Sequence, residues 1–141
     1  DAAAAGVHGL VVVSSGFGES GPEGWEAQQA LVRTARASGL RVLGPNALGF
    51  INTEADVQLN ASLSPHVPPR GPIGFFAQSG APGAALLEAA SKRDLGISTF
   101  VSAGNRADIS GNDLLLERNG QELSRAPHQY YRHSWSRGFY D

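Results

Sequence analysis

The sequence predicts an α/β fold with parallel sheets, and three features of its pattern support this prediction. Two segments each pass from a strand through a short turn into a helix and on to a further strand. Short runs of β-branched and apolar residues without polar alternation predict strands that are buried on both faces. Glycine and proline separate these elements, and connections of this length favour parallel strands joined by right-handed crossovers.

The first unit starts with Leu10–Val13, an apolar run that predicts a strand. A glycine-rich loop follows, and a helix is expected from about Ser20, because Ser20 and Glu23 have the spacing of a capping box. Gly39 is expected to end this helix, and residues 40–43 are expected to form the next strand.

The second unit repeats this order. A strand is predicted at Ile73–Phe76, a helix from Pro82 to about Arg93, and a strand at Ile97–Ser102. Ser110 and Asp113 are spaced to cap a last short helix.

Two segments lie outside these units. Glu54–Pro72 is polar and closes in several prolines, which predicts a linker between two domains. Glu117–Asp141 has no clear apolar period, which predicts either a polar tail or an unrelated extension, disordered in both cases.

Composition excludes several classes of function. A net charge of −2 offers no field for nucleic acid or an anionic membrane surface, and no apolar run is long enough to span a membrane. The absence of cysteine excludes disulfides, thiolate metal sites and a cysteine nucleophile, so a cytoplasmic location is expected by default. Methionine is also absent, so residue 1 is not the product of a start codon, which either processing or a longer parent protein would explain.

The loop Gly16–Gly21 matches the G-x-G-x-x-G pattern of dinucleotide sites. The acid that would bind the ribose is missing after the next strand, and Glu19 would place a carboxylate beside the pyrophosphate. A structural glycine turn and a site for another ligand stay open as alternatives to NAD. Neither Ser20 nor Ser79 has the flanking glycines of a hydrolase nucleophile.

The turn Gln78-Ser79-Gly80-Ala81 lies between a predicted strand and a predicted helix. Such a turn offers backbone N–H groups to an anion, although Ser79 could simply cap the helix. None of the four histidines has metal-ligand spacing, so no metal site is predicted.

Four segments together resemble one family. They read LVVVSSGFGESG at Leu10–Gly21, VLGPNALGFINT at Val42–Thr53, GFFAQSGAPG at Gly74–Gly83 and SAGNRADISGNDLL at Ser102–Leu115. In this order they resemble the NDP-forming acyl-CoA synthetases, which include ADP-forming acetate–CoA ligases, the succinyl-CoA synthetase alpha-like proteins and forms fused to an acetyltransferase domain.

The resemblance implies a domain plan. Residues 1–64 would be the end of a Rossmann-like CoA-binding domain, and 65–72 a proline-rich linker. Residues 73–116 would be the start of a flavodoxin-like succinyl-CoA-ligase domain, and 117–141 a divergent tail.

The resemblance also implies a reaction and its site residues. The family interconverts acyl-CoA, NDP and phosphate with acid, CoA and NTP through an acyl phosphate and a phosphohistidine. The residues expected near CoA are Ser14, Ser15, Gly16, Phe17, Gly44, Pro45 and Asn46. Those expected near the transferring phosphate are Gln78, Ser79, Gly80, Ala81 and Asn105.

Parts of the family pattern are missing from this sequence. The phosphorylated histidine, the acid that supports it and the upstream loop for the CoA nucleotide have no counterpart, so no catalytic residue is assigned and the chain alone is expected to be inactive. ATP or ADP with Mg²⁺ would bind only through an ATP-grasp domain or subunit that is also missing. A stand-alone CoA- or nucleotide-binding regulatory module and a piece of an NAD-dependent enzyme remain as alternatives.

Overall fold

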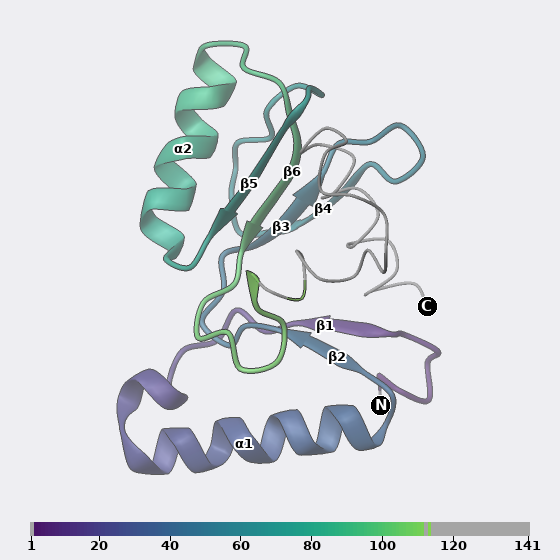
Figure 1. Cartoon of the computed structure of the whole chain (residues 1–141), viewed down its shortest axis with the longest axis vertical. Coiled ribbons are helices and arrows are strands. Elements are labelled where there is room, and N and C mark those ends of the chain that lie inside the picture. Colours follow the sequence, from purple (N-terminus) through teal and green to yellow (C-terminus); the bar gives the residue numbers. More distant parts are fainter. Residues whose placement is uncertain (1, 112, 114–141) are drawn as a thin grey trace.

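The computed structural model describes residues 2–111 and 113 of the 141-residue chain. Two helices lie on two separate sheets, with α2 beside the larger sheet and α1 along the smaller one (Figure 1). In chain order, the elements are β1 (Gly9–Val11), a 3₁₀ helix (Gly18–Ser20), α1 (Pro22–Ala37), β2 (Arg41–Leu43), β3 (Gly49–Asn52), β4 (Leu59–Ser62), β5 (Ile73–Ala77), α2 (Gly80–Lys92) and β6 (Ile97–Ser102).

The first unit is the predicted strand–helix–strand. Strands β1 and β2 pair in parallel, with Leu10 opposite Val42, and α1 covers them through a small apolar cluster that includes Ala35 and Leu40. The prediction that the first strand is buried on both faces is wrong, because all of β1 is only partly buried. Among the described strands β2 is its only partner, so one edge of β1 has no neighbouring strand.

The two ends of α1 differ from each other in how well they were predicted. The capping box is wrong: Gly21 is the N-cap, no side chain caps the helix, and the N–H of Ser20 donates to the carbonyl of Phe17 inside the preceding 3₁₀ turn. The stop at Gly39 is confirmed, with φ at 73°. The N–H of Leu40 donates to the carbonyl of Ala35 over 2.9 Å, which is the bond pattern of a glycine-terminated helix.

The larger sheet has the order β4-β3-β6-β5. Strands β5 and β6 are parallel, as predicted, and the α/β class is confirmed. Strand β3 runs antiparallel to both β4 and β6, which the sequence did not predict. The reason is that the chain enters β3 directly from the turn after β2 and returns in a hairpin, without a helical crossover.

Strand β4 lies inside the polar stretch predicted to be a linker from Glu54 onward. Its residues Leu59-Asn60-Ala61-Ser62 alternate apolar and polar, which is the period-two signal of a half-buried strand. Residues 65–72 contain no helix or strand. The sheet crosses the predicted domain boundary, because β3 and β4 precede residue 65 and β3 pairs with β6, which follows it.

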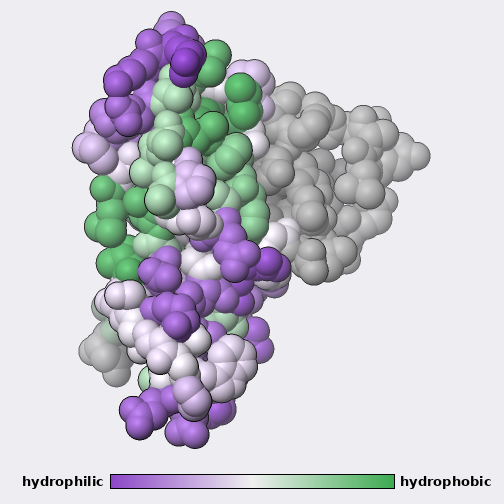
Figure 2. Space-filling view, turned by 90° about the vertical axis from the view of Figure 1, so that its left-hand side faces the viewer, coloured by the Kyte–Doolittle hydropathy of each residue, from purple (hydrophilic) through white to green (hydrophobic). Residues whose placement is uncertain are grey.

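Helix α2 packs on one face of this sheet. Leu87 from the helix is fully buried with Ile51 and Phe100 from the strands. Gly83 permits the close approach, because a Cβ atom there would lie 2.8 Å from Cζ of Phe100. The outward side of α2 is largely apolar (Figure 2), as expected for a helix whose sequence is rich in alanine.

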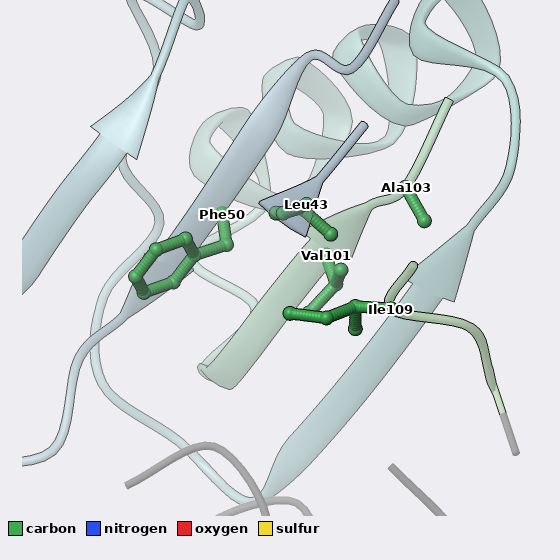
Figure 3. Packing of buried hydrophobic residues seen from close by; sticks show 5 residues of the cluster. All are labelled: Leu43, Phe50, Val101, Ala103 and Ile109. Atoms are coloured by element: carbon green, nitrogen blue, oxygen red, sulfur yellow. The ribbon is translucent and has the colours of Figure 1, made fainter. Parts of the chain in front are cut away.

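A second core cluster joins the two sheets. Leu43 comes from β2, Phe50 from β3 and Val101 from β6, while Ala103 and Ile109 come from the loop after β6, and the five side chains converge (Figure 3). This loop ends at Ser110, whose N–H donates to the carboxylate of Asp113, as one of the two bonds of a capping box does, and whose hydroxyl donates to the same carboxylate. The remainder of the predicted short helix, at residues 114–116, lies outside the described residues. The predicted tail 117–141 lies outside the described residues.

Among the described residues, no helix has the length and apolar character needed to cross a membrane.

Candidate functional site

A pocket of about 610 Å³ lies where several strand ends meet. Its polar members follow β2, β5 and β6, and are Asn46, Gln78, Ser79, Gly80, Gly104 and Asn105. Its apolar members are Val13, Ala47, Leu48, Leu63 and Ala81. The pocket therefore brings all five residues predicted for phosphate together with Asn46, one of those predicted for CoA.

The turn at the start of α2 lines this pocket with its backbone. Ser79 is the N-cap residue of α2, but its side chain makes no capping hydrogen bond. The first N–H groups of a helix have no partner within the helix, and the helix dipole adds about half a positive charge there. Ser79 and Ala81 are exposed and line the pocket, so an anion in the pocket would lie beside the N-terminus of α2, where Pro82 contributes no N–H.

Backbone hydrogen bonds hold the turns around the pocket together. The N–H of Asn46 donates to the carbonyl of Ser14, and that of Asn105 donates to the carbonyl of Pro45, over 2.9 and 2.8 Å. The N–H of Gly104 donates to the carbonyl of Gln78 over 3.0 Å. Four segments that are far apart in the sequence, those that follow β1, β2, β5 and β6, thus form one connected rim.

The remaining residues predicted for CoA lie around this rim. Ser14, Ser15 and Gly16 are exposed on the loop after β1, and Phe17 is half-buried at its end. Gly44 and Pro45 are buried and joined by a cis peptide bond. Gly44 and Pro45 therefore form the buried part of this turn, whereas the exposed Asn46 lines the pocket.

Glu19 occupies the glycine-rich loop with its own carboxylate. One oxygen accepts the N–H groups of Gly16 and Phe17 over 2.5 and 3.3 Å, and the other accepts the side-chain amide of Asn105. The hydrogen bond from Asn105 is the main cause that lowers the pKa of Glu19 to about 2, with smaller contributions from backbone N–H groups, including those of Gly16 and Phe17. The loop therefore already holds an anion, which disfavours NAD there.

The amide of Asn105 makes a second bond, to the side-chain oxygen of Gln28 over 2.9 Å. Gln28 projects from α1, is only 2% exposed, and also accepts the N–H of Gly18. Sequence reasoning assigned no role to Glu19 or Gln28 in positioning Asn105. The carboxylate in the glycine loop was the only signal for this contact, since a glutamine within a helix gives no sign of burial.

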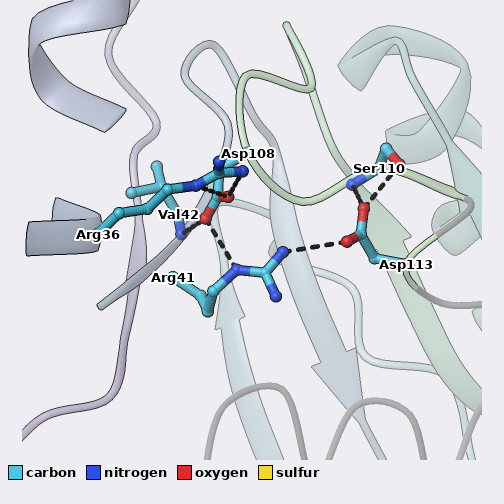
Figure 4. A network of polar contacts seen from close by, with 6 residues as sticks. All are labelled: Arg36, Arg41, Val42, Asp108, Ser110 and Asp113. Atoms are coloured by element: carbon cyan, nitrogen blue, oxygen red, sulfur yellow. Dashed lines mark hydrogen bonds and ion pairs between the residues drawn. The ribbon is translucent and has the colours of Figure 1, made fainter. Parts of the chain in front are cut away.

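An ionic cluster around the buried carboxylate of Asp108 fixes the loop that carries Asn105 (Figure 4). The carboxylate of Asp108 accepts bonds from Nε and Nη2 of Arg36 at 2.9 and 2.6 Å, and from Nε of Arg41 at 3.0 Å. Arg41 also pairs with Asp113 over 3.1 Å. Burial opposes the charge of Arg41, but its bonds to the two carboxylates outweigh this and raise its pKa.

The described residues supply neither a metal-binding cluster nor a basic side chain in the pocket. No group of three histidine, cysteine or acidic residues within it could hold a metal ion. The described residues that line the pocket include no lysine, arginine or histidine, so an anion would be bound there by backbone and amide N–H groups.

Comparison with known proteins shows to which family the chain belongs. Residues 70–126 match the family model described as succinyl-CoA ligase like flavodoxin domain. The alpha subunit of acetate–CoA ligase [ADP-forming] I from Pyrococcus furiosus is 45% identical over 121 residues, which are 86% of this chain and 26% of that subunit.

The segment belongs to the ADP-forming acyl-CoA ligase family. The resemblance seen in its four sequence segments is thereby confirmed. The 4-hydroxybutyrate–CoA ligase [ADP-forming] of Nitrosopumilus maritimus is 36% identical over 77% of this chain and 16% of its own length.

Solved structures of the ligase family share the fold. The dinucleotide forming acetyl-coenzyme A synthetase 1 of Ca. Korarchaeum cryptofilum, solved in complex with phosphate and ADP, superposes with a TM-score of 0.74 at 35% identity. The superposition covers 98% of this chain and 31% of that one. The chain thus spans about a quarter to a third of these two larger relatives, the alpha subunit and the synthetase.

Proposed function

We propose that this chain supplies the phosphate-binding turn and part of the CoA site of an NDP-forming acyl-CoA ligase. The observation that carries the proposal is that Asn46 and the turn Gln78–Ala81 line the same pocket. A phosphate at the helix terminus and a thioester at Asn46 would then be neighbours. Holding two reactants side by side is the main requirement for their transfer reaction.

In the direction that makes NTP, a phosphate oxygen attacks the thioester carbonyl carbon of acyl-CoA. A C–O bond forms, the C–S bond breaks, and CoA leaves as a thiolate that takes up a proton. The phosphoryl group of the acyl phosphate next passes to a histidine nitrogen, releasing the carboxylate, and then to NDP.

The histidine of this relay and the ATP-grasp part that binds nucleotide and Mg²⁺ have no counterpart in this sequence. The role of this chain's residues is therefore to bind and orient. The N–H groups near Ser79, Gly80 and Ala81 would stabilise the phosphate charge, and the dipole of the 13-residue helix α2 would add to it. Ser14, Ser15, Gly16, Phe17, Gly44, Pro45 and Asn46 would guide the CoA thiol end toward that phosphate.

The test is a phosphate titration of the ¹⁵N-labelled chain, followed by amide chemical shifts. We expect the amides of residues 79–81 and 105 to move. Gly80→Val should abolish these chemical-shift changes, because the branched side chain would obstruct the approach of phosphate to the N–H groups of the turn. Ala85→Val is the matched control, since Ala85 is exposed on the same helix away from the pocket, and it should leave the titration unchanged.

Movement of other amides while those of residues 79–81 stay fixed would reject the phosphate role. It would leave Ser79 as the residue that begins the helix and nothing more.

A further inference from the structure

One wall of the pocket is apolar and partly open to solvent. Leu63 is 65% exposed and Val13 is 40% exposed, although both line the pocket. Leu48 is half-buried, and Ala47 is buried at 3% exposure. Exposed aliphatic side chains that line a pocket can still lose contact with water when a ligand binds.

The proposed reaction places an acyl group at this wall. In an acyl phosphate a single oxygen joins the carbonyl carbon to phosphorus, so the acyl group begins directly beside the phosphate site. The CoA thiol end approaches from the side of Asn46. The tail of the acid must then extend along the remaining lining, which is aliphatic.

The charges around the pocket select against a second carboxylate. No basic side chain is found among its described lining residues. The carboxylate of Glu19 lies next to the pocket, bonded to the lining residue Asn105. An anionic tail that lay along the aliphatic wall would lose water there without gaining a charged partner, which is unfavourable.

The position of Leu63 makes its side chain available for contact with the tail. Its backbone N–H donates to the carbonyl of Leu48 over 2.9 Å, which fixes the main chain after β4. Its side chain is left exposed and therefore has the most apolar surface to bury among the exposed aliphatic residues of this wall.

From these contacts we infer that the site takes acids with an uncharged, apolar tail, and that Leu63 contacts this tail and sets the preference. This inference rests on the phosphate role of the turn at residues 79–81.

The test uses phosphonates, whose C–P bond resists hydrolysis and whose head group reproduces the phosphate anchor. Butylphosphonate carries an apolar tail, 3-phosphonopropionate carries a carboxylate tail, and inorganic phosphate has none. Each would be titrated into the full chain, labelled in its amides and in its leucine and valine methyl groups.

We expect all three probes to move the amides of residues 79–81. Butylphosphonate alone should move the methyl signals of Leu63 and Leu48, and it should bind at least three times more tightly than 3-phosphonopropionate. Leu63→Ala should weaken butylphosphonate binding about three- to tenfold and leave phosphate binding unchanged. This is less than a methylene contributes in an enclosed apolar pocket, because Leu63 lies on an open wall. Leu63→Lys should reverse the preference toward the carboxylate tail.

Leu95→Ala is the matched control, because Leu95 is also an exposed leucine, at 47%, but follows the opposite end of α2. It should leave all three affinities unchanged. Equal binding of both phosphonates, or an unchanged butylphosphonate affinity in Leu63→Ala, would overturn the inference and leave the phosphate site standing. If no probe moves residues 79–81, the proposed function fails and this inference with it.

Discussion

The carboxylate of Asp108 accepts the backbone N–H of Val42 over 2.7 Å, across 66 residues of sequence. This bond joins the loop after β6 directly to strand β2. Two arginines complete the shell of the same carboxylate, whose side chain is fully buried. The loop that brings Asn105 to the pocket is thus anchored on the smaller sheet.

Asp108→Asn should destabilise the chain by about 3 kcal/mol, because the buried amide removes the charge that pairs with the two arginines and puts an NH₂ donor in place of one of the two carboxylate oxygens that accept hydrogen bonds. The measurement is the free energy of unfolding in urea. Asp113→Asn is the control: its carboxylate is 38% exposed and pairs with only one of the arginines, so its loss should be below about 1 kcal/mol. Equal losses for the two variants would contradict the role given to Asp108.

The ionisation of Glu19 should report on its contact with Asn105. Its pKa of about 2 lies below the ordinary value of 4.5, so its bonds stabilise the fold above about pH 4.5. That contribution is lost as the pH falls toward 2, because the protonated acid accepts hydrogen bonds less strongly. A ¹³C titration of the Glu19 carboxyl group should give this midpoint directly.

Asn105→Ala should raise the pKa of Glu19 back toward 4.5, since the hydrogen bond from Asn105 is the largest cause of the shift. Asn60→Ala is a suitable control, because Asn60 bonds locally to Ser62 in β4. An unchanged midpoint in Asn105→Ala would show that the two side chains are not bonded in solution.

Gly104→Ala should open the rim of the pocket. Gly104 has φ at 56°, and a Cβ atom there would lie 2.2 Å from the carbonyl oxygen of Pro45, so the two turns must separate. Gly39→Ala isolates the backbone effect, because Gly39 has φ at 73° with no atom within 4 Å of a Cβ.

We expect Gly39→Ala to cost about 1 kcal/mol of stability, the usual cost of a left-handed alanine, and to leave phosphate shifts at residues 79–81 intact. Gly104→Ala should cost more and should also weaken those shifts. Phosphate binding that survives Gly104→Ala unchanged would show that the rim does not shape the site.

The sequence predictions were correct where a feature depends on residues that are neighbours in the chain, and failed where it depends on distant partners or on an unusual backbone conformation. Strand β6 and the glycine stop of α1 were predicted correctly, because each depends on residues next to it in the chain. The capping box at Ser20 failed, because Gly21 takes φ at 108° and begins the helix one step later. Strand β4 was missed, because two apolar positions are a weak signal without knowledge of the partner strand.

The sequence by itself determined the α/β class, the two strand–helix–strand units, the family and the turn at residues 78–81, since periodicity, glycine positions and motif order are all local properties. Only the tertiary structure decided that β3 runs antiparallel between β4 and β6, that the turns after β2, β5 and β6 form one pocket, and that Glu19 fills its own glycine loop. The physical reason is that strand direction, pocket walls and hydrogen-bond partners are set by segments that meet only after the chain has folded. Asn105 illustrates the difference: its motif was visible in the sequence, but its bonds to Glu19 and Gln28 cross 86 and 77 residues.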